Sequence, residues 1–206
     1  MIPDVLAGLL RVMTGARPRW VGCVPEDRPR IYFANHSSNL DGPTIWSLLP
    51  RPLRRVTRPV AAQDYWSAGP IRRYLATRVF NALLIERRNP TPRNNPLEPM
   101  VCAVQGGSSL IVFPEGTRNH GDEPGEFKAG LFYLAKRCSG VELIPVLLDN
   151  FSRILPKGEL LPIPLIGSVS FGAPLCLGDH ESRDEFLARA RQSVINLRNS
   201  PLGDPC

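Results

Sequence analysis

The sequence contains no long hydrophobic run. No stretch of the chain approaches the roughly 20 consecutive apolar residues that a membrane-spanning helix needs. The N-terminus also lacks the basic start and the cleavage site of a signal peptide. We therefore expect no spanning segment and no export signal, which leaves peripheral attachment as the way in which this chain would meet a membrane.

The cysteines are odd in number and scattered along the chain. The five cysteines include no Cys-x-x-Cys pair, and no histidine stands at ligand spacing from them. Neither a disulfide framework nor a zinc site is indicated, so we expect no metal. Reduced thiols fit the cytoplasmic side of a cell. The sequence also has no internal repeat and no low-complexity tract.

Acidic residues are outnumbered, most of all in one part of the chain. There are 25 lysines and arginines against 19 acidic residues, a formal net charge of +6. Between positions 51 and 88, where Asp64 and Glu86 are the only acids, the arginines are Arg51, Arg54, Arg55, Arg58, Arg72, Arg73, Arg78, Arg87 and Arg88. Such a patch can meet nucleic acid, an anionic membrane surface, or acidic ligands such as coenzyme A and acyl carrier protein. No zinc-finger spacing or RNA-recognition motif accompanies it, so we expect no nucleic-acid partner. Solvated helix faces would account for part of the cluster.

Strand-like and helix-like segments alternate along the chain. The predicted strands are 31–34, 59–62, 82–85, 110–113, 143–148 and 168–171. The predicted helices are 43–49, 70–78, 97–105, 128–137 and 183–199, and Ser182 with Glu185 forms a capping box for the last. This order predicts an α/β fold with a mixed, mostly parallel sheet flanked by helices. A chain of this length is most simply one domain over residues 1–206.

A short helix is predicted at the N-terminus. Arg11, Arg17 and Arg19 lie beside its apolar stripe, with Trp20 just beyond. The residues of the stripe recur at helical spacing: Ile2, Val5, Leu6, Leu9, Leu10 and Met13. An amphipathic helix at a membrane interface has this composition, and so does a helix that docks on the core of its own domain. The sequence leaves both alternatives open for residues 1–20.

The most informative segment is Asn-His-Ser-Ser-Asn-Leu-Asp-Gly-Pro, which contains His36 and Asp41. Histidine titrates near neutral pH, and a nearby carboxylate can fix its tautomer and stabilise the imidazolium. Five residues of plain helix would point the two side chains apart. Because Pro43 suits the first position of a helix, residues 36–41 are expected in a loop that lets the side chains meet. The pair predicts a general base with its orienting acid, and a loop histidine that merely bonds to an aspartate would give the same pattern.

A second segment with polar chemistry runs from Leu110 to Arg118. Its apolar half is predicted as a buried strand. The strand breaks at Pro-Glu-Gly-Thr-Arg, which delivers an acid, a flexible glycine, a hydroxyl and a guanidinium to its carboxyl end. In open α/β sheets, ligands bind at that edge.

Together, Asn-His-x-x-x-x-Asp and Phe-Pro-Glu-Gly-Thr-Arg resemble the first and third blocks of the glycerolipid acyltransferase family. That family includes the lysophosphatidic acid and lysophospholipid acyltransferases. Residues 83–87 resemble its second block, residues 144–146 its fourth, and residues 125–130 a stretch that often follows the third. The resemblance covers residues 30–150 and implies an acyltransferase-like α/β fold.

The resemblance also implies a reaction and its partners. An acyl group would pass from acyl-CoA or acyl carrier protein to the hydroxyl of a lysophospholipid, by default 1-acylglycerol-3-phosphate, with no cofactor besides the thioester co-substrate. His36 would be the general base and Asp41 its orienting acid. The enzyme would lie peripherally on the cytoplasmic side of the cell membrane, at an anionic surface. The substrate-binding residues that the resemblance implies are Arg87, Glu115, Gly116, Thr117, Arg118 and Lys128.

Other functions could use the same residues. A thioesterase or lipase would release a free fatty acid, and a lyso-aminolipid could replace the phospholipid as acceptor. A lipid-binding protein without activity is a third class, but it would not need to keep both His36 and Asp41. Ser37 and Ser38 lack the Gly-x-Ser-x-Gly context of a serine nucleophile. The apolar, proline-rich run 151–164 could line an acyl groove or pack as a loop.

Overall fold

The computed structural model describes residues 2–86, 95–119, 121, 123–149 and 167–200. Arg87 and the proline-rich run 151–164 lie outside these residues. The predictions made for both therefore stay predictions.

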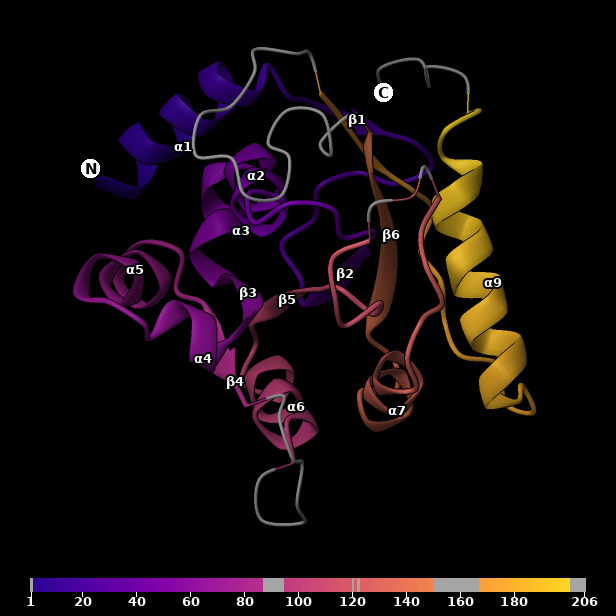
Figure 1. Ribbon diagram of the computed structural model, residues 1–206. Helices are drawn as coiled ribbons and strands as arrows, with labels where there is room; N and C mark the ends of the chain where they lie inside the picture. The colour runs from indigo at the N-terminus through magenta and orange to yellow at the C-terminus, as the bar shows by residue number, and fades with distance from the viewer. Residues whose placement is uncertain (1, 87–94, 120, 122, 150–166, 201–206) are drawn as a thin grey trace.

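The described residues form a seven-stranded sheet flanked by helices (Figure 1). The strands are β1 (Arg17–Trp20), β2 (Arg30–Ala34), β3 (Thr57–Ala62), β4 (Leu83–Ile85), β5 (Ser109–Val112), β6 (Glu142–Asp149) and β7 (Ser168–Phe171). Their spatial order is β1-β7-β6-β2-β5-β3-β4. Neighbouring strands are parallel except for the antiparallel pair β6 and β7. The predicted α/β fold with a mixed, mostly parallel sheet is confirmed.

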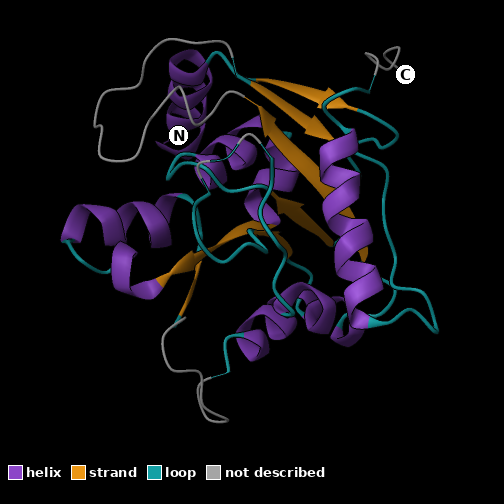
Figure 2. Ribbon diagram, turned by 45° about the vertical axis from the view of Figure 1, so that its right-hand side comes forward, coloured by secondary structure: helices purple, strands orange, loops and turns teal. Residues whose placement is uncertain are grey.

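Helices cover both faces of the sheet (Figures 1 and 2). One face carries α1 (Ile2–Thr14), α2 (Asp41–Leu48), α3 (Arg51–Val56) and the π-helical turn η1 (Leu75–Val79). The other face carries α6 (Leu97–Gln105), α7 (Gly130–Arg137) and α9 (Arg183–Asn196). The short helices α4 (Gln63–Trp66) and α5 (Pro70–Tyr74) lie at the edge formed by β3 and β4.

The central strands are apolar because helices cover both of their faces. Every residue of β2 and β5 is buried. Successive side chains of a strand point to opposite faces, so Tyr32 packs in the layer of α1 and α2 while Ile31 and Phe33 pack toward α6, α7 and α9. The two strands are neighbours, and their carboxyl ends are therefore fixed side by side within the core.

All six predicted strands are present, with ends within two residues of those expected. The sequence pattern does not predict β1, whose Arg-Pro-Arg-Trp has no apolar alternation. Pro18 is compatible with a strand there because β1 lies at the edge of the sheet. The predicted helix 70–78 is divided into α5 and η1, α7 begins at Gly130 and α9 ends at Asn196. The capping box of Ser182 and Glu185 is confirmed.

One predicted boundary next to His36 is wrong. Helix α2 begins at Asp41 and not at Pro43, so Asp41 lies in the first helical turn rather than in the preceding loop. Pro43 is tolerated inside this turn because the first backbone N–H groups of a helix have no partner within the helix. The helix dipole also favours a carboxylate at this end.

Helix α1 docks on the core of its own domain, one of the two alternatives that the sequence leaves open, and contact with a membrane stays a prediction. Ala7, Leu10 and Thr14 are buried against the domain. A second apolar face, formed by Ile2, Val5, Leu9 and Val12, is exposed, with exposed fractions between 51% and 82%. Because these residues lie at spacings of three and four, they form one stripe along the helix. Among the described residues, no helix has both the length and the apolar character needed to cross a membrane.

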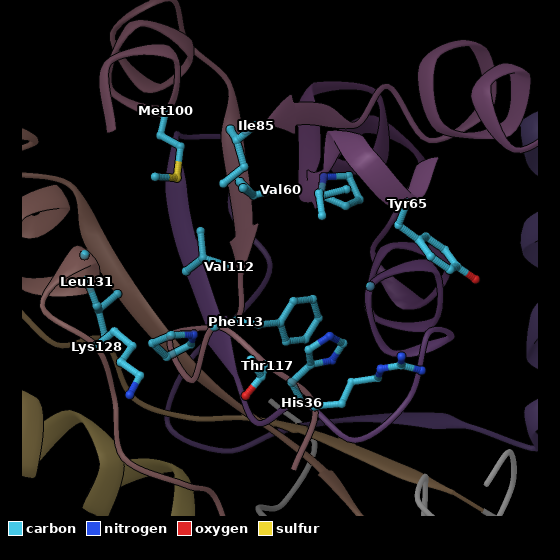
Figure 3. Close-up of a pocket in the computed structure, with 18 of the residues that line it drawn as sticks. His36, Val60, Tyr65, Ile85, Met100, Val112, Phe113, Thr117, Lys128 and Leu131 are labelled. Atoms are coloured by element: carbon cyan, nitrogen blue, oxygen red, sulfur yellow. The ribbon is translucent and has the colours of Figure 1, made fainter. Parts of the chain in front are cut away.

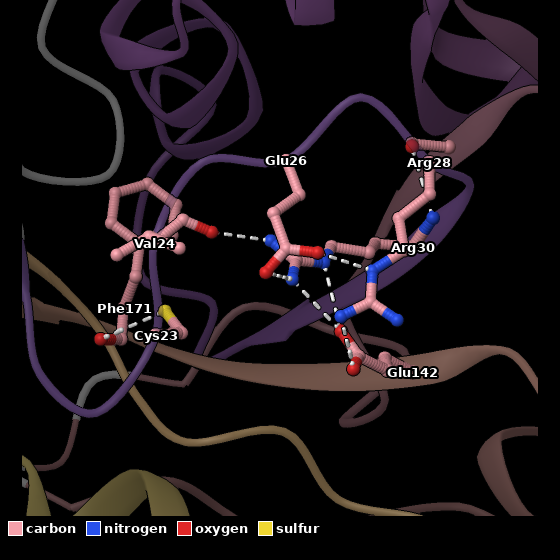
Figure 4. A network of polar contacts seen from close by, with 8 residues as sticks. Cys23, Val24, Glu26, Arg28, Arg30, Glu142 and Phe171 are labelled. Atoms are coloured by element: carbon pink, nitrogen blue, oxygen red, sulfur yellow. Dashed lines mark hydrogen bonds and ion pairs between the residues drawn. The ribbon is translucent and has the colours of Figure 1, made fainter.

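An ion-pair network surrounds the buried Arg30 at the start of β2, the end of this strand opposite His36 (Figure 4). Arg30 is only 1% exposed, and its guanidinium donates to Glu142 at 2.9 Å and to the carbonyl oxygen of Val24 at 2.6 Å. Glu26 pairs with the same guanidinium at 3.2 Å. Burial raises the pKa of the nearby Cys23 thiol to about 11, so the thiol stays protonated at neutral pH. These contacts join the start of β2 to the start of β6.

Candidate active site

The candidate site lies where β2 and β5 end. The chain leaves β2 through Asn35 into His36, and it leaves β5 through Phe113 into the Pro-Glu-Gly-Thr-Arg segment. Asn35 holds this exit in place, since its side-chain amide exchanges two hydrogen bonds with the backbone of Leu148 on β6, at 3.0 and 2.8 Å. In the other segment, the N–H of Gly116 donates to the carbonyl oxygen of Phe113, and Gly116 has a φ of +73° that favours glycine.

His36 and Asp41 are brought together as predicted. Nδ1 of His36 lies 2.9 Å from Oδ2 of Asp41. The imidazole is 18% exposed and the carboxylate is fully buried. With Nδ1 protonated toward the carboxylate, Nε2 is the nitrogen that can accept a proton.

The Asp41 carboxylate is held by the loop that precedes it. Its Oδ2 accepts hydrogen bonds from the backbone N–H groups of Ser37 and Ser38, both at 2.7 Å, in addition to His36. The two serines thus contact the carboxylate through their backbone. Three donors converge on one oxygen, which fixes the carboxylate and, through it, the imidazole.

The carboxylate of Glu115 binds the backbone of His36. It is 4% exposed, and its Oε1 accepts a hydrogen bond from the backbone N–H of His36 at 2.8 Å. Its Oε2 accepts from the N–H of Gly125, also at 2.8 Å. The carboxylate thus joins the segment after β5 to the segment after β2 and to the loop before α7.

Two residues that sequence reasoning missed also fix His36. The ring of Phe113 stacks on the imidazole, with centroids 4.2 Å apart and an interplanar angle of 23°. The N–H of Asn119 donates to the carbonyl oxygen of His36 at 2.7 Å. Phe113 is part of the Phe-Pro-Glu-Gly-Thr-Arg segment, and its place at the end of a buried strand is the signal that points to it.

A cavity of about 460 Å³ extends from His36 along β3, β4 and β5 (Figure 3). Its apolar lining includes Ile85, Met100, Val112, Leu131 and Leu134. In Figure 3, Met100 and Ile85 lie at the end opposite His36. The site therefore combines one proton acceptor with an apolar pocket of the size that small-molecule sites have.

The cavity also has polar lining residues, which include Thr117, Arg118 and Lys128. In Figure 3, Thr117 lies next to His36 and Lys128 lies next to Leu131. Within the described ranges, neither Arg118 nor Lys128 has an ion-pair partner, so both cations are available to an anionic ligand. Glu115 and Asp41 do not line the cavity and lie behind its wall.

Two further polar lining residues are Asn39, at a variable position of the Asn-His-x-x-x-x-Asp motif, and Tyr65, which lies in no motif. The side-chain amide of Asn39 donates to the hydroxyl oxygen of Tyr65 at 3.2 Å, and both residues line the cavity. The guanidinium of Arg72 lies over the Tyr65 ring, 4.8 Å from its centroid.

No group of three His, Cys, Asp or Glu side chains that could hold a metal ion occurs in the part of the chain that the structure describes.

Comparisons with known proteins show the family of the chain. The family described as Acyltransferase matches residues 21–149. A 1-acyl-sn-glycerol-3-phosphate acyltransferase of Chlamydomonas reinhardtii is 28% identical over 183 residues, which cover 84% of this chain and 49% of that protein. A protein of the same name from Escherichia coli is 32% identical over 137 residues, which cover 63% of this chain and 51% of that protein. The chain thus spans about half the length of both relatives.

A solved structure has the same fold. The crystal structure of the 1-acyl-sn-glycerophosphate acyltransferase PlsC from Thermotoga maritima matches 95% of this chain and 79% of its own, with a TM-score of 0.69. The identity between the two sequences is 21%, so this likeness concerns the fold.

Proposed function

This chain belongs to the Acyltransferase family, and we propose that it moves a fatty acyl group from an acyl thioester to the hydroxyl of a lysophospholipid. The preferred acceptor in this proposal is 1-acylglycerol-3-phosphate, the substrate class named by several relatives. The donor is acyl-CoA or acyl carrier protein. We also propose that residues 1–206 form one domain, because all described strands share one sheet.

The observation that carries the proposal is the His36–Asp41 pair, whose imidazole lines a largely apolar cavity. His36 takes the proton of the acceptor hydroxyl on Nε2, while Asp41 stabilises the imidazolium. The acceptor oxygen forms a bond to the thioester carbonyl carbon, and the carbon–sulfur bond breaks. The departing thiolate takes the proton, which restores neutral His36. No covalent enzyme intermediate is needed.

The remaining lining residues suit the two substrates. The apolar lining of the cavity accommodates an acyl chain and excludes water, which protects the thioester from hydrolysis. Arg118 and Lys128 bind the phosphate of the acceptor, since arginine makes bidentate contacts with phosphate. Arg87 has the same proposed role and lies outside the described residues. Gly116 and Thr117 shape the acceptor site from the turn after β5.

The proposed place of action is the cytoplasmic side of the cell membrane, with peripheral attachment. The exposed stripe of α1 supports it, because Ile2, Val5, Leu9 and Val12 present apolar side chains that an interface would bury. The net charge of +6 favours an anionic surface.

The direct test is to identify the products. The full chain is incubated with a panel of lysophospholipids and lyso-aminolipids, each with acyl-CoA and with acyl-loaded carrier protein, and the lipids are analysed by mass spectrometry. Formation of a diacyl phospholipid, highest with 1-acylglycerol-3-phosphate, supports the proposal. Release of free fatty acid without any acylated acceptor would make the protein a hydrolase instead, and an acylated aminolipid alone would change the acceptor class.

A further inference from the structure

A second cavity, unrelated to the active site, lies where α1, α2 and α3 meet. Its volume is about 170 Å³. We call it the arginine pocket, and its lining residues are Pro3, Asp4, Trp46, Arg51, Arg54, Arg55, Val79 and Asn81. None of them lines the cavity that contains His36. A single buried water needs only about 10–15 Å³ of cavity volume, so the pocket has room for a polyatomic ion.

The lining of the arginine pocket carries excess positive charge. Three guanidinium groups of α3 face one carboxylate, that of Asp4. Arg51 and Arg54 both pair with this carboxylate, at 3.2 and 2.9 Å, and thus share one negative charge. In the described part of the chain, Arg55 has no ion-pair partner, although it lines the same pocket.

Arg54 is the buried member of the group. Its side chain is 9% exposed, stacks on Trp46 at 5.3 Å from the ring centroid, and donates to the carbonyl oxygen of Ser47 at 3.2 Å. Arg11 donates to the same carbonyl oxygen at 2.7 Å. Burial, and next the charge of Arg11, lower the pKa of Arg54. Arg54 is thus compensated by a single carboxylate, which it shares with Arg51, and a further anion would add to that compensation.

We propose that the arginine pocket binds a phosphate group. Arginine is suited to phosphate because its planar guanidinium can donate two parallel hydrogen bonds, and Arg55 and Arg51 are accessible enough to do so. Pro3 and Asp4 belong to the same first turn of α1 as the exposed Ile2. A lipid headgroup at a membrane that meets α1 could therefore supply the phosphate, and so could free phosphate in solution.

The first measurement is the affinity of the full chain for inorganic phosphate by isothermal titration calorimetry. The test variant is Arg51→Gln with Arg55→Gln, and the control is Arg137→Gln with Arg183→Gln. The control pair also consists of exposed arginines and changes the net charge equally. We expect about tenfold weaker binding for each pocket arginine removed, the size of one charge-assisted hydrogen bond, and no change in the control. Circular dichroism confirms that each variant is folded.

The second measurement separates the two sources of phosphate. Flotation with vesicles of phosphatidylcholine containing phosphatidic acid is compared with vesicles of phosphatidylcholine alone. If the pocket variant loses binding to the phosphatidic acid vesicles as well as to phosphate, the ligand is a lipid headgroup. If it loses only phosphate binding, the ligand is the free ion.

A third variant should increase the affinity for phosphate instead of lowering it. Asp4→Asn removes the carboxylate that occupies Arg51 and Arg54, so phosphate should bind more tightly to it than to the wild type. Equal phosphate affinity in the wild type and the Arg51, Arg55 variant would overturn the proposal. An equal loss in the control pair would do the same, because the effect would then be one of net charge.

Discussion

The carboxylate of Glu115 accepts a hydrogen bond from the backbone N–H of His36, with the two atoms 2.8 Å apart. Its second oxygen accepts from Gly125 at the same distance, and the side chain is buried. Family resemblance implies that Glu115 shapes the acceptor site, but its carboxylate does not line the cavity. We therefore interpret Glu115 as a positioning residue that fixes the backbone from which the imidazole projects.

Glu115→Gln should lower kcat about 10- to 100-fold and leave both KM values nearly unchanged. One amide oxygen replaces two carboxylate oxygens, and the amide NH₂ group then faces a backbone N–H, which costs about 1–3 kcal/mol and shifts His36. Gly125→Ala should act in the same direction, because a Cβ there would lie 2.8 Å from Oε2 of Glu115. Steady-state kinetics check this, with the exposed Glu126→Gln as control. A raised KM for the acceptor with unchanged kcat would show that Glu115 contacts substrate.

Arg118→Ala should raise the KM for a phosphate-bearing acceptor about tenfold and leave the KM for the donor unchanged. The reason is the loss of a charge-assisted contact in the cavity that His36 lines. Kinetics with each substrate varied in turn check this, and Arg137→Ala on α7 is the control because that arginine pairs with Glu98 on the surface. If the donor KM rises instead, Arg118 holds the thioester carrier.

Replacing Val5, Leu9 and Val12 by glutamine should weaken binding to anionic vesicles without changing the Tm. Because these side chains are exposed, their replacement should weaken the proposed membrane contact and leave the core unchanged. Leu10→Ala is the contrasting variant, because Leu10 is 5% exposed and its truncation should cost about 2–5 kcal/mol of stability. Vesicle flotation and thermal unfolding measure the two effects. Wild-type flotation of the triple glutamine variant would assign membrane contact to another surface.

Arg30→Met should destabilise the fold by about 3 kcal/mol while the kcat of the folded protein stays the same. The substitution leaves Glu142 without its buried partner, at the end of β2 opposite His36. Arg28→Ala removes an exposed partner of the same carboxylate and should cost at most about 1 kcal/mol. Urea unfolding of both variants tests this, and equal losses would mean that burial of Arg30 contributes nothing.

Much of the fold follows from sequence pattern because the central strands are continuous apolar runs. Ile31–Ala34 and Leu110–Val112 are buried on both faces, and burial of that kind leaves a clear signal. The sequence of β1 gives no such signal. This edge strand contains alternating arginines and is defined by its pairing with β7 rather than by its own composition. The start of α2 is misplaced for a local reason: Pro43 suggests a first position, whereas the first turn already begins at Asp41.

Only the parts of the candidate site that belong to sequence motifs could be predicted from the sequence. His36 and Asp41 meet because the loop between them turns its backbone N–H groups onto the carboxylate, which local sequence can suggest. The stacking of Phe113 on His36 and the contact of Asn39 with Tyr65 join segments that are distant in the chain. Such contacts arise from the arrangement of neighbouring strands and helices, so no single segment encodes them.

The central claim is that His36 is the general base of acyl transfer. It is tested most directly by kcat for His36→Ala and Asp41→Asn, measured by mass spectrometry with acyl-CoA and 1-acylglycerol-3-phosphate, with circular dichroism to confirm folding. The account predicts that His36→Ala loses activity by about a hundred- to ten-thousand-fold and that Asp41→Asn, which removes the charge that stabilises the imidazolium, also falls steeply. Transfer at the wild-type rate by a folded His36→Ala protein would contradict it.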